Sequence, residues 1–185
     1  MALRDAILAA LLDGEASGYD LAKAFDTSVA NFWMATPQQL YRELERMQAA
    51  GLIEARLIEQ DRRPNKHLFS LTDAGREQLR RFTAIPPKPG AIREDLMVAI
   101  QALDAGDAAA VRDAVVARIA LAQDKLAHYE RRQAELLDGR SEAQFLAEAP
   151  RIGPYLNLLR GVSFERENLA WFRRVIAVID RRRAG

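Results

Sequence analysis

At 185 residues, with 49% hydrophobic and 29% charged side chains, the chain has the composition of an ordinary globular protein. Its 27 basic and 26 acidic residues give a net charge of +1. This net charge does not indicate a polyanionic partner, although a local basic patch can still bind one. The absence of cysteine excludes a disulfide scaffold and a thiolate metal site. The N-terminus lacks the features of a signal peptide, and no uncharged apolar run reaches the roughly 18 residues of a membrane span. We therefore predict a cytoplasmic protein without a membrane partner.

Two helices are predicted at the start of the chain. Apolar residues recur at helical spacing over residues 3–13, and Gly14 ends this first helix. Ser17 is the predicted N-cap of the second helix. Its expected buried stripe consists of Tyr19, Leu21, Ala22 and Phe25. A short connector with Trp33 then leads to the third helix.

The third helix carries the most specific local signals in the chain. Thr36 is its predicted N-cap, Pro37 occupies the first helical position, and Gln39 completes a capping box. Gly51 is the expected C-terminal stop. The core side of this helix is predicted to consist of Leu40, Leu44 and Met47.

From Leu52 the apolar period changes from 3.6 to 2, which predicts a two-stranded hairpin ending near Leu71. Its tip is basic and contains Arg62, Arg63, Pro64, Asn65 and Lys66. Thr72 is the predicted N-cap of a fourth helix that runs to about Phe82. A proline-rich stretch follows, which divides the chain into a first domain at 1–85, a linker at 86–91 and a second domain at 92–185.

The second domain is predicted to be entirely helical, with helices at 92–104, 107–138 and 154–182. Apolar residues in the last helix recur at nearly heptad spacing over about four heptads, which favours pairing with another helix. We predict that a second copy of the chain is that partner, through a row consisting of Val162, Leu169, Phe172, Ile176 and Ile179. The alternative is that the row packs on 107–138 within one chain. Trp171 lies just off the row, where it either lines a cavity or lies at a surface.

No catalytic constellation is apparent. The two histidines, His67 and His128, have no partner at metal-ligand spacing, and no glycine-rich phosphate loop follows a strand. Acidic residues alternate with arginine, as on solvated helix faces. We therefore expect no enzymatic activity, no cofactor and no metal site.

The third helix and the hairpin instead suggest a DNA-binding surface. Amide side chains can pair with adenine and arginine with guanine in the major groove, and a basic hairpin tip can contact phosphates. The candidate contact residues are Thr36, Gln38, Gln39, Tyr41 and Arg42 on the helix, and Arg62, Arg63, Asn65 and Lys66 on the hairpin. Residues 1–85 hold 11 basic and 12 acidic side chains, so any DNA footprint is local. This near-neutral charge keeps open the alternative of a protein-interaction module.

The order of these elements, with its motifs, resembles the PadR family of bacterial transcriptional regulators. The motifs are "SGYDLAKAF" at 17–25, "QQLYRELERMQAAGLIE" at 38–54 and "RRPNKHLFSLTDAGREQL" at 62–79. Met47 and Phe69 stand where leucine and tyrosine are usual. The second half resembles the long helical domain of virulence-activator-like members.

The resemblance implies a mainly α-helical fold, namely a winged helix-turn-helix with a two-stranded wing and an all-α dimerisation domain. It implies a homodimer, usually a repressor, that reads a near-palindromic operator in double-stranded DNA. Some members respond to small-molecule effectors, and the resemblance leaves open whether this chain binds one; it assigns no effector-binding residues.

Overall fold

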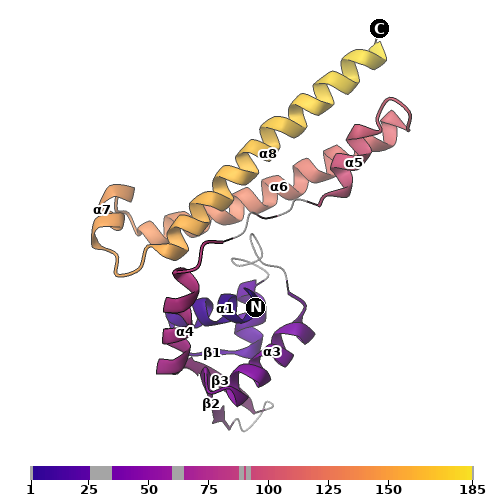
Figure 1. The fold of residues 1–185 in the computed structure, drawn as a ribbon. Helices are drawn as coiled ribbons and strands as arrows, with labels where there is room; N and C mark the ends of the chain where they lie inside the picture. The colour runs from indigo at the N-terminus through magenta and orange to yellow at the C-terminus, as the bar shows by residue number, and fades with distance from the viewer. Residues whose placement is uncertain (1, 26–34, 60–64, 88–89, 91–92, 185) are drawn as a thin grey trace. The chain divides into compact units, whose positions relative to one another are not determined.

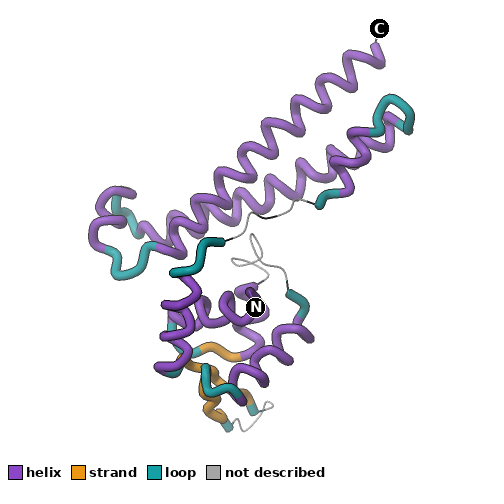
Figure 2. Tube along the Cα trace, viewed as in Figure 1, coloured by secondary structure: helices purple, strands orange, loops and turns teal. Residues whose placement is uncertain are grey.

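The computed structural model describes residues 2–25, 35–59, 65–87, 90 and 93–184. Trp33, Arg62 and Arg63 lie outside this range. The chain divides into two compact units, Met1–Pro89 and Gly90–Gly185. Helices dominate both units, and the strands belong to the first (Figures 1 and 2). Among the described residues, no helix combines the length and apolar character needed to cross a bilayer.

The first unit has the predicted order of helices around a small sheet (Figure 1). Its helices are α1 (Ala2–Ala10), the short 3-10 helix η1 (Leu11–Asp13), α2 (Gly18–Ala24), α3 (Pro37–Ala49) and α4 (Asp73–Thr83). Its strands are β1 (Ala16–Ser17), β2 (Ile53–Ile58) and β3 (Lys66–Leu71). The predicted caps are confirmed, because the side chains of Ser17, Thr36 and Thr72 each accept a backbone N–H three residues ahead.

The sheet has three strands in the order β1-β3-β2, so the prediction of a two-stranded hairpin was incomplete. Ala16 pairs with Phe69 and Ser17 with Leu68 on the free edge of β3. The physical reason is the N-cap itself: Ser17 must be non-helical, and its φ of −78° and ψ of 161° are extended. The backbone before α2 can therefore pair with β3.

One apolar core joins all the elements of the first unit. The third helix contributes Leu40, Leu44 and Met47, as predicted, and each is about 1% exposed. The remaining buried apolar residues are Ile7, Leu8, Leu11, Leu21, Phe25, Ile53, Phe69, Leu71 and Leu79. Tyr19 was predicted to be buried and is 71% exposed, because Leu21 and Phe25 define the inner side of α2 and Tyr19 lies outside it.

The second unit is an antiparallel pair of long helices with a short helix at each end (Figure 1). The long helices are α6 (Ala108–Leu137) and α8 (Gly153–Ala184), and the short ones are α5 (Asp95–Gln101) and α7 (Glu142–Glu148). Helix α7 was not predicted. It is held by a Ser141–Gln144 capping box and by Phe145, whose ring centroid lies 4.8 Å from that of Tyr155.

The apolar row of α8 packs against α6 within the same chain. Val162, Leu169, Phe172 and Ile179 are at most 6% exposed, and Ile176 is half-buried beside Phe172. The prediction that these residues form an interface with a second copy is therefore corrected: a single chain already covers them. A 3.5-residue repeat shows only that a helix has a helical partner, and here that partner is α6. Trp171 is half-buried in the cluster around Leu96 and Val115.

Polar contacts fix the register of the helix pair. Arg112 donates from Nε and one terminal nitrogen to the two carboxylate oxygens of Asp180, at 2.6 and 3.1 Å. This contact lowers the pKa of Asp180 and raises that of Arg112. Glu165, at 5% exposed, interrupts the apolar row of α8. Lys125 Nζ lies 3.8 Å from its carboxylate and Asn168 donates to it at 3.2 Å, so the buried charge is partnered.

The buried Tyr129 makes the second unit sensitive to alkaline pH. Burial, with a smaller contribution from Glu165, raises the pKa of Tyr129 above its ordinary value of 10.0. The folded protein keeps this phenolic proton at a pH where the unfolded chain loses it, so stability falls as the pH rises above about 10. We expect Tyr129→Phe to lose less stability than wild type between about pH 8 and pH 10.5 in urea unfolding. The exposed Tyr19→Phe is the control, and an unchanged pH dependence in Tyr129→Phe would contradict the assignment.

Candidate nucleic-acid interface

Helix α3 presents a polar surface because its start and its buried side are both fixed. Thr36 Oγ1 accepts the Gln39 N–H at 3.2 Å, and Gln39 Oε1 accepts the Thr36 N–H at 3.0 Å. Pro37 stands at the first helical position, and Gly51 ends the helix with φ of 67°. With Leu40 and Leu44 anchored in the core, the opposite side of α3 faces solvent.

The structure brings two of the predicted base-reading residues together on that side. Gln38 and Arg42 are four residues apart and therefore neighbours on the helix surface. Both are exposed, and neither makes a hydrogen bond or ion pair with another described residue. Tyr41 lies at the flank and is 46% exposed. A neutral amide, a guanidinium and a phenol are thus all available to a ligand.

Gln39 occupies a different environment from Gln38, although both were predicted as base readers. Its side-chain carbonyl is engaged in the capping box. A bidentate contact to adenine needs both the carbonyl and the amide nitrogen, so Gln39 would have to give up the cap to make one. The structure therefore assigns Thr36 and Gln39 to holding the start of α3.

The predicted hairpin tip is partly described. Asn65 and Lys66 are exposed at the start of β3, whereas Arg62 and Arg63 lie outside the described residues. The hydrogen bond from the Ser17 side chain is the largest cause of the lowered pKa of Asp20 in α2, and the nearby Lys66 ammonium lowers this pKa further. The described part of the hairpin tip therefore lies near the first turn of α2, on the same unit as α3.

Tyr19 is an exposed aromatic residue of this unit that was assigned to the core from the sequence. Helix α2 has only seven residues, too few for the apolar period to separate inner from outer positions. The ring of Tyr41 lies against Gly18, and the sequence could not show this contact because it depends on how α2 and α3 cross.

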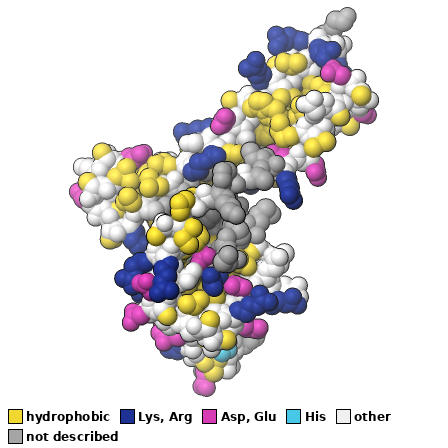
Figure 3. All heavy atoms as spheres, in the orientation of Figure 1, with side chains coloured by type: hydrophobic (Ala, Val, Ile, Leu, Met, Phe, Trp, Pro, Cys, Tyr) yellow, Lys and Arg dark blue, Asp and Glu magenta, His cyan; other side chains and the backbone are white. Residues whose placement is uncertain are grey.

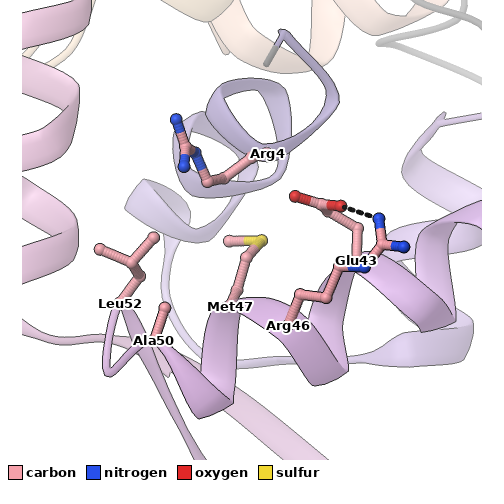
Figure 4. A pocket seen from close by; sticks show the side chains of 6 residues that line it. All are labelled: Arg4, Glu43, Arg46, Met47, Ala50 and Leu52. Atoms are coloured by element: carbon pink, nitrogen blue, oxygen red, sulfur yellow. Dashed lines mark hydrogen bonds and ion pairs between the residues drawn. The ribbon is translucent and has the colours of Figure 1, made fainter.

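The first unit also has a shallow pocket between α1 and the C-terminal half of α3 (Figure 4). Arg4, Glu43, Arg46, Met47, Ala50 and Leu52 line it. Its single carboxylate, Glu43, lies 3.5 Å from Arg46, which leaves no second acid or base for general acid–base chemistry. Among the residues the structure describes, no group of three or more potential ligands could hold a metal ion.

Three helices, of which the third is capped and faces outward, followed by a β-hairpin form a winged helix-turn-helix. Two family models match the chain. One, the PadR-like family of transcriptional regulators, covers residues 7–81, and the other, the C-terminal domain of virulence activator alpha, covers residues 92–180.

Two relatives match nearly the whole chain. The probable transcriptional regulator Rv1176c of Mycobacterium tuberculosis is 32% identical, over 99% of this chain and 100% of the relative. The crystal structure of Bacillus subtilis PadR with operator DNA superposes with a TM-score of 0.77 at 26% identity, covering 97% of this chain and 99% of that one. The same protein in complex with p-coumaric acid has a TM-score of 0.70 at 25% identity, covering 97% and 99%.

The chain belongs to the PadR-like family of transcriptional regulators. The family membership and the winged-helix fold expected from the motifs are thus confirmed.

Proposed function

We propose that this protein is a homodimeric repressor that binds a near-palindromic operator through α3 and the hairpin. The observation that carries the proposal is the exposed pair Gln38 and Arg42, on a chain similar over almost its full length to an operator-bound PadR. The relative from Bacillus subtilis is a negative transcriptional regulator, which supports repression.

The proposed contacts divide into two chemical roles. Gln38 and Arg42 read base edges in the major groove, where an amide pairs with adenine and a guanidinium with guanine. Tyr41 and the hairpin residues contact phosphates and fix the orientation of the protein on the duplex. The hairpin contacts are Arg62, Arg63, Asn65 and Lys66.

A second copy is proposed to pair through the second unit. Two binding helices must be held about 34–36 Å apart to reach successive half-sites. The residues predicted for this contact are internal, but α8 also carries exposed Leu156, Phe164 and Val178 on the side away from α6. Hydrophobic side chains gather visibly on the surface of the long helices (Figure 3). We assign the contact between copies to this outer side of α8.

Charging this outer side should separate the copies. Phe164→Asp combined with Val178→Asp is expected to convert a dimer into a monomer of 20.7 kDa, because burying an unpaired carboxylate is unfavourable. Mass measurement by light scattering at micromolar concentration checks this. The substitutions Ala117→Asp and Ala120→Asp add the same charge at exposed positions of α6, outside the proposed contact, and serve as the control. A monomeric wild-type protein would contradict the proposed dimer.

We also propose that a small-molecule effector releases the protein from its operator. The support for an effector is the p-coumaric acid bound by the Bacillus subtilis relative. The proposed location of the protein is the cytoplasm, together with the DNA. No enzymatic role is proposed, since the relatives are transcriptional regulators.

The testing experiment is fluorescence anisotropy with the DNA just upstream of the protein's own gene, against scrambled DNA of equal length. We expect a preference of about 10³ or more for the upstream duplex, one dimer per site, and steep weakening with salt. If neither duplex is preferred, a genome-wide selection of bound fragments decides whether an operator lies elsewhere. No enriched fragment, together with salt-independent binding to a protein, would favour the interaction module that the near-neutral first domain allows.

A further inference from the structure

The backbone conformation at Gly18 does not require a glycine. This residue is the first residue of α2 and is buried, and its φ lies outside the positive region that favours glycine. Alanine is the better helix former of the two residues. The reason for a glycine here must therefore be space around the Cα atom.

The ring of Tyr41 occupies that space. A Cβ atom built on Gly18 would overlap Tyr41 Cε1 and lie 3.1 Å from Cζ and 3.3 Å from Cδ1. Only side-chain atoms of Tyr41 crowd this position, and no backbone atom is among the three nearest. Because Tyr41 is 46% exposed, an added methyl group would push the ring outward and leave the helices in place.

The surroundings make Gly18 a rigid support. Ser17 and Asp20 form a capping box, with Ser17 Oγ donating to Asp20 at 2.6 Å and accepting the Asp20 N–H at 3.1 Å. Ser17 is also paired with Leu68 in the sheet. On the other side, Leu40 anchors α3 one residue before Tyr41. The Tyr41 hydroxyl makes no hydrogen bond to another described residue, so it can donate to a ligand.

We propose that Gly18 is a positioning residue for DNA binding, which leaves room for the edge of the Tyr41 ring against the start of α2 so that the Tyr41 hydroxyl donates to a backbone phosphate of the operator. This inference rests on the proposed function. It assigns to the glycine a role in affinity that does not depend on the stability of the fold.

The test is a double-mutant cycle with a duplex that the wild-type protein has selected from a random pool. Tyr41→Phe should weaken binding about three- to tenfold, as expected for one lost hydrogen bond. Gly18→Ala should weaken it by a similar factor in the wild-type background. In the Tyr41→Ala background Gly18→Ala should change affinity less than twofold, because the methyl group then has room.

Gly153→Ala is the matched control, because Gly153 also begins a helix but has no atom within 4 Å of an added Cβ. Equal losses from Gly18→Ala in both backgrounds, or no loss in either, would overturn the inference. Failure of Gly18→Ala to fold would also overturn it, because the proposed role leaves the helices in place. A wild-type protein that selects no duplex would instead refute the proposed function.

Discussion

Gly75→Ala is expected to destabilise the first unit by about 2–3 kcal/mol. A Cβ atom on Gly75 would overlap the carbonyl oxygen of Leu52 and lie 3.2 Å from Leu71 Cδ2. Unlike the ring beside Gly18, this carbonyl is backbone and cannot rotate away. The gain of about 1 kcal/mol from replacing a helical glycine with alanine is smaller than this cost.

The clash matters because α4 and the end of α3 share one hydrogen-bonded junction. Thr72 Oγ1 donates to the Gly51 carbonyl at 2.7 Å, and the Thr72 N–H donates to the Leu52 carbonyl at 3.3 Å. Thr72 Oγ1 also accepts the Gly75 N–H at 3.1 Å. A displaced Gly75 would strain all three contacts.

Hydrogen exchange followed by mass spectrometry measures the effect locally, which suits a chain with two units that need not unfold together. Amides of α3 and α4 should exchange faster in Gly75→Ala, while α6 and α8 keep their wild-type protection. Ala74→Gly is the control in the same helix, since it lowers helix propensity without a clash. Unchanged protection of α4 in Gly75→Ala would show that the junction can relax.

Gln38→Ala and Arg42→Ala should each weaken operator binding by about 1–3 kcal/mol, roughly 5- to 150-fold, and blur specificity at one base pair. Both side chains are exposed and available on the outer side of α3. Anisotropy titrations against the operator and single-base variants of it would show the lost discrimination. Arg63→Ala is expected to weaken binding to all sequences alike and to reduce the salt slope by about one.

Gln39→Ala is the matched comparison for Gln38→Ala, because the two glutamines are adjacent but only Gln39 is held in the capping box. Loss of its capping hydrogen bond should destabilise the start of α3 by about 1 kcal/mol without a base-specific signature. If Gln39→Ala shifts the preferred base and Gln38→Ala does not, then Gln39 leaves the capping box when the protein binds DNA. In that case Gln39, and not Gln38, reads the base.

The local signals in the sequence determined where most elements begin and end. The N-caps at Ser17, Thr36 and Thr72 and the stop at Gly51 involve residues within four positions of one another, so their hydrogen bonds can be inferred without the rest of the fold. The change of period after Leu52 likewise located the hairpin. The PadR-like motifs then pointed to the family that the comparisons confirm.

The tertiary structure alone decided which surface meets which. Pairing of β1 with β3 joins residues about fifty positions apart, and no local sequence pattern predicts this pairing. The heptad row of α8 showed that the helix needs an apolar partner, but its burial energy is the same against α6 as against a second copy. The free energy of burial depends on the apolar area that is covered and not on which chain covers it. An N-cap hydrogen bond, in contrast, depends on one nearby atom. For that reason the ends of the helices followed from the sequence, and the partners of Tyr41 and of α8 required the fold.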